Sequence, residues 1–405
     1  MPSLSENNAT TTNATASKRQ HFIFAIATVL YWSTLYIYVP ILSPYLEDRG
    51  ISISLIGFIL GSYGLTQVIT RLPLGMYSDV MSRRKPFLII GMLAGLISCA
   101  LFMLPGTWGG PLAGRLMAGI CAAAWVPFSV LYASYYPTNQ THQAMGTLSF
   151  LTVFGQLVGM SASGSLAAWG GWNYAFVCGI IVAGIGAIVA LFVHEPRAVT
   201  TQAKTKPPTT NRIASLSSVF RSKLLWRVSI LSLLAHGILF ITMFGFTPLQ
   251  ASELGATKSQ LTLIVIAFMV PHAIVSFISG RLLAPRFGSR NVIAAGFLLA
   301  AVFTAAIPYS DNLVSLALTQ TGNGMAQAMY FPLLLSFAIR PFPIAQRATA
   351  MGFYQSVYSI GMFIGPYIAG GLNSLGGLRA GFLFGSSLGL IAAVISWSKQ
   401  LRDED

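Results

Sequence analysis

Residues 75–85 read Gly75-Met76-Tyr77-Ser78-Asp79-Val80-Met81-Ser82-Arg83-Arg84-Lys85, and they lie between two long stretches without charge. The earlier stretch covers residues 50–70 and the later one covers residues 86–114. Because a helix needs about 20 residues to cross the hydrocarbon core of a bilayer, each stretch is long enough to span a membrane. A short charged loop between two such stretches is typical of a membrane protein.

The composition of the whole chain supports the same conclusion. Of 405 residues, 54% are hydrophobic and only 8% are charged, whereas a soluble protein usually has about 25% charged residues. This excludes an ordinary soluble enzyme. Cys99, Cys121 and Cys178 lie in apolar stretches without metal-ligand spacing, so we expect them to be packing residues. Neither a metal site nor a cofactor is expected.

Charged residues divide the chain into long uncharged runs. The run 116–194 has two polar interruptions and therefore holds three spans, which brings the total to twelve. Only helices and closed barrels cross a bilayer, and barrel strands would show alternating segments of about ten residues. We therefore predict an all-α membrane protein with twelve transmembrane helices. The other runs are 20–46, 50–70, 86–114, 228–252, 259–280, 291–310, 312–339, 348–378 and 380–398.

The basic residues predict the orientation in the membrane. With the N-terminus inside, 20 of the 24 Lys and Arg residues lie on the cytoplasmic side, as the positive-inside rule requires. Only Arg49, Lys258 and Arg379 lie outside, and Arg115 lies within the fourth span. We predict a multi-pass protein of the cytoplasmic (plasma) membrane with both termini inside. The net charge of +14 is thus a topology signal, and no nucleic-acid partner is expected.

The spans fall into two similar halves. The longest polar stretch, 195–222, is predicted to be a cytoplasmic linker between six-helix bundles at 21–194 and 223–400, with a disordered cytoplasmic tail at 1–20 and a short one at 401–405. Residues 144–146, Ala-Met-Gly, recur as 350–352. Two pseudo-symmetric bundles are typical of secondary transporters. The glycine pairs Gly155/Gly159 and Gly361/Gly365 allow close helix approach, and we expect them to form the surfaces that slide.

The loop at 75–85 resembles the signature between the second and third helices of the major facilitator superfamily. Gly75, Asp79, Arg83 and Arg84 match that signature, whereas Val80 and Ser82 depart from it. The resemblance, which extends over residues 20–400, implies the fold of this superfamily and a transport function. It also implies that Asp79 faces the start of the eleventh helix, near residues 347–351, and holds the halves together on the cytoplasmic side.

The same resemblance implies that spans one, four, seven and ten line a central cavity. No carboxylate lies at mid-depth, so the cavity suits neutral, zwitterionic or anionic solutes better than cations. His236 and His272 titrate nearest to neutral pH and are candidates for proton coupling. Arg115, inside span four, is a candidate for the cavity. The alternative is that its side chain extends to the outer interface, with Glu47 and Asp48 as its partners. The cavity candidates are Tyr31, Trp32, Tyr36, Arg115, Trp125, His236, Gln320, Asn323, Gln327, Tyr330 and, in span eleven, Gln355.

These features favour a proton-coupled exporter (antiporter) of a small organic solute that works by alternating access. The pair Gly365-Pro366 resembles the bacterial drug and metabolite efflux branch. An importer or facilitator of the same fold is the alternative, and a non-transporting membrane sensor is the second. There is no catalytic constellation and no phosphate-binding Gly-x-x-x-x-Gly-Lys-Ser/Thr motif, so we do not expect an enzyme. The expected partners are the solute, the lipid bilayer and protons as coupling ion, and the chain is expected to be a monomer.

Overall fold

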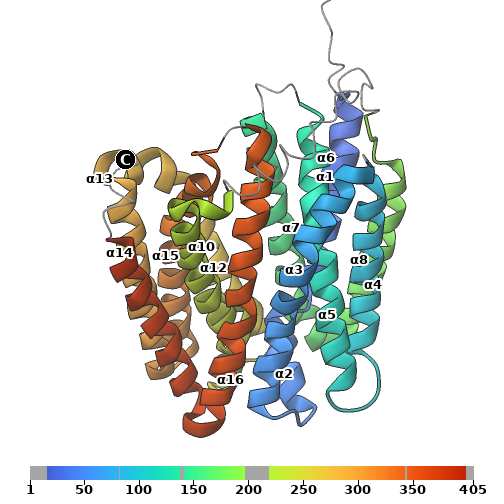
Figure 1. The fold of residues 1–405 in the computed structure, drawn as a ribbon. Coiled ribbons are helices and arrows are strands. Elements are labelled where there is room, and N and C mark those ends of the chain that lie inside the picture. The colour runs from blue at the N-terminus through green and yellow to red at the C-terminus, as the bar shows by residue number, and fades with distance from the viewer. Residues whose placement is uncertain (1–15, 82, 137–140, 197–218, 343, 398–405) are drawn as a thin grey trace, which may run out of the picture.

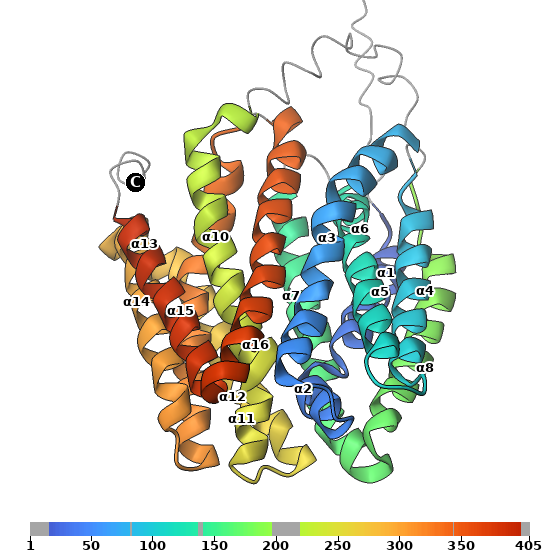
Figure 2. The ribbon, with the colours of Figure 1, turned by 60° about the horizontal axis from the view of Figure 1, so that its bottom comes forward.

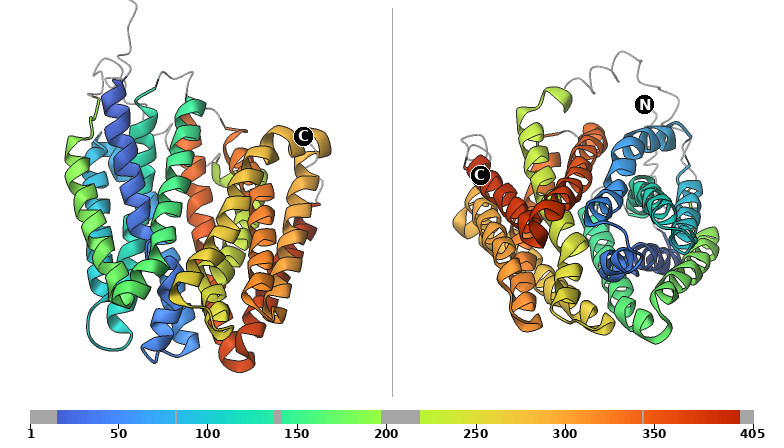
Figure 3. Two further views of the ribbon diagram at one scale, coloured as in Figure 1. Left: turned by 180° about the vertical axis from the view of Figure 1, so that it is seen from behind. Right: turned by 90° about the horizontal axis from the view of Figure 1, so that it is seen from below.

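Two helical bundles lie side by side in the computed structural model, which describes residues 16–81, 83–136, 141–196, 219–342 and 344–397 (Figure 1). A view along the bundle axis shows the two halves as separate groups of helices that meet at the centre (Figure 3). Helices make up nearly all of the described ranges, and these contain no strand. We call the end where α1 begins and α16 ends the inner end, following the predicted orientation, and the opposite end the outer end.

In the part of the N-terminal half that the structure describes, eight helices form six spans. Helices α1 and α2 together form the first span, and α5 and α6 form the fourth. The helices are α1 (Lys18–Tyr36), α2 (Val39–Asp48), α3 (Ile53–Met81), α4 (Lys85–Phe102), α5 (Gly109–Ala123), α6 (Trp125–Ala133), α7 (Thr141–Gly170) and α8 (Trp172–Phe192).

The C-terminal half repeats this plan with more irregular segments. Two π-helical turns and one 3₁₀ turn interrupt or extend its spans. The elements are α10 (Lys223–Ile241), η2 (Thr242–Phe246), α11 (Thr247–Glu253), α12 (Lys258–Ile278), η3 (Ser279–Leu283), α13 (Ala284–Phe287), α14 (Ser289–Ala306), η4 (Ile307–Tyr309), α15 (Leu313–Ile339) and α16 (Ile344–Ser396).

The number of crossings agrees with the predicted twelve-helix fold. Ten helices in the described ranges are long and apolar enough to cross a membrane, and the last of them covers 47 residues. That helix contains non-helical backbone at Gly376 and Gly377, so it supplies two spans. Helix α15, with 27 residues, supplies the remaining one. The prediction of an all-α membrane protein is confirmed.

Turns and breaks recur at equivalent positions in the two halves. Gly171 (φ 79°) ends the fifth span and Gly377 (φ 67°) ends the eleventh, and only glycine adopts such backbone without strain. The first span is broken just before Pro40, and the seventh is broken by η2 just before Pro248. Proline lacks a backbone donor and suits the first turn of a new helix. The duplication seen in the sequence is therefore also a duplication of backbone irregularities.

The halves pack closely along α3 and α16, which lie next to each other at the centre of the molecule (Figure 2). A Cβ atom on Gly57 would lie 2.8 Å from the Cα of Gly370, and one on Gly61 would lie 2.4 Å from the carbonyl oxygen of Phe363. Near the outer end, a Cβ on Gly164 of α7 would lie 2.0 Å from the carbonyl oxygen of Lys258 in α12. Glycine thus sets the distance between the halves.

The glycine pairs that we expected on the sliding surfaces lie elsewhere. Gly155 and Gly159 face Val29 and Ser33 of α1, and Gly361 and Gly365 face Leu233 and Gly237 of α10 in the same way. These glycines bring the fifth span against the first, and the eleventh against the seventh, within each half. The expectation was wrong because spacing shows that a helix can be approached closely but does not show which helix approaches it.

Candidate substrate site

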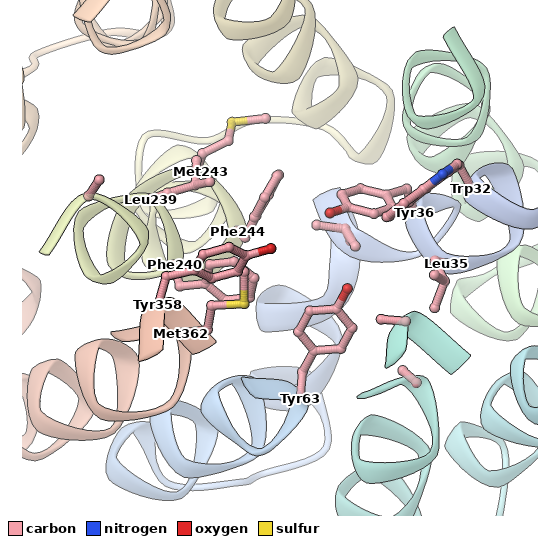
Figure 4. Close-up of a cluster of buried hydrophobic side chains, with 14 of the residues drawn as sticks. Trp32, Leu35, Tyr36, Tyr63, Leu239, Phe240, Met243, Phe244, Tyr358 and Met362 are labelled. Carbon is pink, nitrogen blue, oxygen red and sulfur yellow. The ribbon is translucent and has the colours of Figure 1, made fainter. Parts of the chain in front are cut away.

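A small cavity lies at the centre of the molecule, where the two halves meet. The space left among its lining side chains is about 10 Å³, which is room for about one water molecule. The structure therefore describes the protein closed around this region. Tyr36, Tyr63 and Tyr358 come from three different helices, and their hydroxyl groups point towards the same central space (Figure 4). The lining residues are Leu35, Tyr36, Val39, Tyr63, Arg115, Phe240 and Phe244.

Tyr36 and Phe244 occupy equivalent places in the two halves and touch each other across the cavity. Their ring centroids are 5.5 Å apart, and each residue lies four positions before the proline that restarts its broken span. Tyr63 and Phe240 also join the two halves, with their rings stacked and the centroids 5.7 Å apart. The breaks in spans one and seven thus bring aromatic rings from both halves to the centre.

Arg115 is the first of two cations beside this cavity. Its side chain is 2% exposed, its Nε donates to the carbonyl oxygen of Leu60 at 3.3 Å, and its guanidinium lies 4.4 Å from the ring centroid of Tyr63. The sequence suggested Glu47 and Asp48 as partners, but Asp48 accepts a hydrogen bond from Trp172 instead. Arg115 therefore points into the bundle rather than to the outer interface.

Arg71 is the second cation, and sequence reasoning did not identify it as a site residue. Its Nη1 donates to the hydroxyl of Tyr358 at 2.6 Å and to Oε1 of Gln355 at 3.1 Å. The side chain is only 5% exposed, and its buried Nε has no hydrogen-bond partner within the described ranges. The uncharged stretch 50–70 ends just before Arg71, which is one of the 20 basic residues that the positive-inside count places on the cytoplasmic side. This was wrong, because α3 continues past it to Met81.

His236 extends this group of side chains into span seven. Its ring stacks on that of Tyr358, with centroids 4.0 Å apart and an interplanar angle of 2°. Its Nδ1 is 2.8 Å from the carbonyl oxygen of Ser232. We call Arg71, His236, Gln355 and Tyr358 the Arg71 cluster. It combines one fixed positive charge from the N-terminal half with polar groups from the C-terminal half.

Three predicted cavity residues form an aromatic wall in the N-terminal half. Trp32 lies 4.9 Å from Trp125 and 5.7 Å from Tyr36, measured between ring centroids. Tyr31 stacks on Trp125 at 6.1 Å and donates its hydroxyl to the carbonyl oxygen of Cys121. The indole nitrogen of Trp32 is buried, and no described residue forms a hydrogen bond with it. This wall adjoins the cavity through Tyr36.

The predicted residues of span ten contact their own half instead of the central cavity. Asn323 accepts a hydrogen bond from Thr304 of α14 at 3.2 Å, and Tyr330 stacks on Phe297 of α14 at 4.2 Å. Gln320 is fully buried and bonds to its neighbour Thr319, and Gln327 is half-buried. His272 stacks on Phe268 of its own helix. None of these residues lines the cavity in this closed form.

The signature loop is described only in part. The surroundings of Gly75 and the side chains of Asp79 and of residues 343–349 lie outside the described part of the structure, so the expected contact of Asp79 with the eleventh helix stays a prediction. Arg83 is exposed, and the backbone N–H of Arg84 donates to Glu195 at the end of span six. The described part of this loop thus joins span three to span six.

The electrostatics of the centre are decided by the two arginines. Among the side chains that the structure describes, no carboxylate forms an ion pair with Arg71 or Arg115. The described acids lie at helix ends or in loops, as with Glu47, Glu195 and Asp311. A guanidinium has five N–H donors in a planar fork that matches a carboxylate or phosphate. The central region can therefore bind an anion and repels a cation.

Comparison with known proteins places these features in context. The model of the Major Facilitator Superfamily matches residues 24–252 and 248–404. An uncharacterised MFS-type transporter of Methanocaldococcus jannaschii is 23% identical over 363 residues, which cover 88% of this chain and 92% of that protein. The cis,cis-muconate transport protein of Acinetobacter baylyi is 24% identical over 277 residues, 67% of each chain. A crystal structure of a nucleoside transporter superposes with a TM-score of 0.77 at 16% identity, over 93% of this chain and 98% of that one.

Proposed function

Because this chain belongs to the Major Facilitator Superfamily, whose model matches most of its length, we propose that it carries small organic anions across the membrane by alternating access between its two halves. Members of this superfamily are transporters, so the chain is a multi-pass membrane transporter and not an enzyme. The observation that carries the choice of substrate is the pair of buried arginines, Arg71 and Arg115, without a carboxylate partner in the described structure.

The physical argument rests on the cost of a buried charge. A guanidinium removed from water without a counter-ion is destabilising by several kcal/mol. Arg71 is held by the neutral groups of Tyr358 and Gln355, which compensate for only part of the lost hydration. An anionic solute supplies the missing charge and can accept two parallel N–H bonds. A cationic solute meets two like charges in a region of low dielectric constant.

The relative from Acinetobacter baylyi supports this substrate class. It is a transport protein for cis,cis-muconate, and muconate is a dicarboxylate. The two arginines of this chain come from α3 and α5, and both lie near Tyr63. A solute with two anionic groups could contact both, and the aromatic wall of Trp32 and Trp125 would pack against an unsaturated or apolar body between them.

We propose export as the direction of transport and the plasma membrane, with both termini inside, as the location. The membrane potential of a cell is negative inside, so an anion that leaves moves downhill. Each negative charge gains about 2.3 kcal/mol per 100 mV, or about 50-fold in concentration. A net anion can thus be driven out without a buried carboxylate to bind protons. If a proton is exchanged, His236 is the better of the two histidine candidates, because it touches Tyr358 of the Arg71 cluster.

The experiment is a comparison of wild type, Arg71→Gln and Asp79→Asn, expressed at equal levels, by untargeted mass spectrometry of cells and medium. We expect at least one organic anion to accumulate outside only with wild type. That anion is then tested in proteoliposomes against cationic and neutral compounds of similar size. Transport of a cation that is unaffected by Arg71→Gln would contradict the proposal. Depletion of an anion from the medium would show import, and no difference among the three strains would favour the sensor.

A further inference from the structure

A groove of about 370 Å³ lies on the C-terminal half, away from the central cavity. It is formed where the first turns of α10 meet the last turns of α16, near the inner end of both helices. Its volume falls in the range of about 300–1,000 Å³ that is usual for small-molecule sites. It shares no lining residue with the central cavity. The lining residues are Arg221, Lys223, Trp226, Arg227, Ile230 and Ile395.

Three of the six lining residues are cations, and they stand where a helix already carries positive charge. Lys223 begins α10, and Arg221 precedes it by two positions. The N-terminal end of a helix is equivalent to about half a positive charge, and the first turn of α10 contains no acidic residue. Basic residues at this end therefore destabilise the helix unless an anion is present.

In the part of the chain that is described, Arg227 has an unpaired guanidinium nitrogen, which also indicates that an anion binds in the groove. Its Nη1 is buried and has no hydrogen-bond partner among the residues that the structure describes, although the side chain lines an open groove. Lys223, Arg227 and Ile230 follow one another at spacings of four and three residues, so they lie on one face of α10. A buried guanidinium N–H without a partner costs about 1–3 kcal/mol, which is recovered when an acceptor occupies the groove.

The surroundings of the groove are those of a membrane interface. Trp226 is 44% exposed and packs edge-on against Phe353, and tryptophan is enriched at the level of lipid headgroups. Towards the membrane interior the two helices present exposed aliphatic side chains, with Ile230 at 40%, Ile391 at 49% and Val394 at 72%. A ligand that fits has an anionic head and an apolar chain.

We propose that this groove binds the phosphate headgroup of an anionic phospholipid from the cytoplasmic leaflet. The headgroup lies against Arg221, Lys223 and Arg227, and an acyl chain lies along Ile230 and Val394. Basic pockets between transmembrane helices on the cytoplasmic side bind such headgroups in general. The site does not depend on the anionic solute proposed above, but it does depend on the predicted orientation, which places the inner end in the cytoplasm.

The test uses the fluorescence of Trp226 in the full-length protein, reconstituted into phosphatidylcholine vesicles. Bromine on an acyl chain quenches a nearby indole. The fluorescence of Trp226 is obtained by subtracting the fluorescence of the Trp226→Phe variant from that of the unchanged protein. The variant keeps an aromatic ring against Phe353. We expect brominated phosphatidylglycerol to quench Trp226 more than brominated phosphatidylcholine does. Arg227→Gln should weaken the preference about fivefold, since each basic residue near the surface contributes about that much to binding.

Arg221→Gln provides a second variant at an exposed position, in case Arg227→Gln folds poorly, and it should act in the same direction. Arg286→Gln is the matched control, because Arg286 is an exposed cation of α13 near the same end of the half and does not line the groove. Equal quenching by the two brominated lipids would overturn the proposal. It would also be overturned if inorganic phosphate removed the preference, or if the preference appeared only after deletion of residues 401–405, which contain three acidic residues.

Discussion

The guanidinium of Arg71 and the hydroxyl of Tyr358 lie 2.6 Å apart, although the two residues are 287 positions apart in the chain. Arg71 belongs to span two of the first half, and Tyr358 belongs to span eleven of the second. This hydrogen bond therefore crosses the boundary that must open and close during transport. Under the proposed function Arg71 also binds the solute, so binding of the anion would change how the two halves are held together.

Replacement of Arg71 should remove most of the affinity for the transported anion. Loss of one partner from a buried, hydrogen-bonded charged pair costs at least about 2 kcal/mol, or about 30-fold in affinity. Arg71→Lys keeps the positive charge but loses the planar fork of N–H donors. We therefore expect this variant to retain only a minor part of the affinity that Arg71 contributes. Binding is measured with the purified protein by isothermal titration calorimetry.

The control for Arg71 is Arg379→Gln at the outer end. Arg379 donates to the hydroxyl of Tyr309 at 2.7 Å and lies 5.0 Å from its ring, so the contact resembles that of Arg71 but is exposed. Its replacement should leave anion affinity within about twofold, because exposed pairs contribute little. If Arg379→Gln weakened binding as much as Arg71→Gln, the effect would be one of general charge and not of this site.

A double-mutant cycle on Arg71→Gln and Tyr358→Phe should show strong coupling in the free energy of unfolding. Hydrogen bonds to charged groups contribute about 1.5–3 kcal/mol, and Tyr358→Phe keeps the ring that stacks on His236. The same cycle on Arg379→Gln and Tyr309→Phe should give less than about 1 kcal/mol. Both cycles are measured by thermal unfolding in one detergent. Equal coupling in the two pairs would show that burial adds nothing to the Arg71 contact.

Much of the fold could be predicted because lipid makes sequence patterns strict. Every span must be long and nearly free of charge, so the uncharged run 20–46 anticipates the first span, which extends from Lys18 to Asp48. The breaks inside spans one and seven were not predicted. Pro40 and Pro248 were the available signals, at equivalent places in the two halves, but an apolar run does not show whether its helix is continuous.

The site was harder to predict because its contacts join the two halves. The uncharged run 50–70 ends at Arg71, so the pattern predicts the boundary of a span there. Its hydrogen-bond partners Gln355 and Tyr358 lie more than 280 positions away, so no local pattern reveals them. The uncharged residues 72–78 after Arg71 were the signal that α3 continues. Arg115 was found because uncharged runs flank it on both sides.

A methyl group on Gly370 should separate α3 from the eleventh span, which is the first part of α16, near the outer end of the molecule. The new Cβ of Gly370→Ala would lie 2.9 Å from the Cα of Gly57 and 3.0 Å from the carbonyl oxygen of Ile53, and backbone atoms cannot move aside cheaply. Overpacking of this kind costs at least about 1 kcal/mol. The labelling of Val39→Cys in the cavity by an impermeant maleimide, added from the predicted extracellular side, should therefore become at least about fivefold faster.

The neighbouring residue provides the control for Gly370. A Cβ on Gly371 meets nothing within 4 Å. The labelling of Val39→Cys should therefore be as fast in the Gly371→Ala variant as in the protein that carries Val39→Cys alone. The protein without Val39→Cys gives the background labelling of the three native cysteines, of which Cys99 and Cys121 are buried. If both alanine variants labelled alike, helix propensity rather than the contact between the halves would explain the result.

Lys258 should hold the outer ends of the two halves together through Trp172. Its ammonium lies 4.0 Å from the ring centroid of Trp172, and the indole N–H of Trp172 donates to Asp48 at 2.9 Å. A partly exposed cation–π contact contributes about 0.5–1 kcal/mol, so Lys258→Gln should speed the labelling of Val39→Cys about two- to fivefold. Lys258→Arg should keep the slow rate, because a guanidinium also binds the ring face. Lys223→Gln removes a lysine at the inner end and is the control for net charge. An unchanged rate in Lys258→Gln would mean that Gly164 and its neighbours close the outer end without this contact.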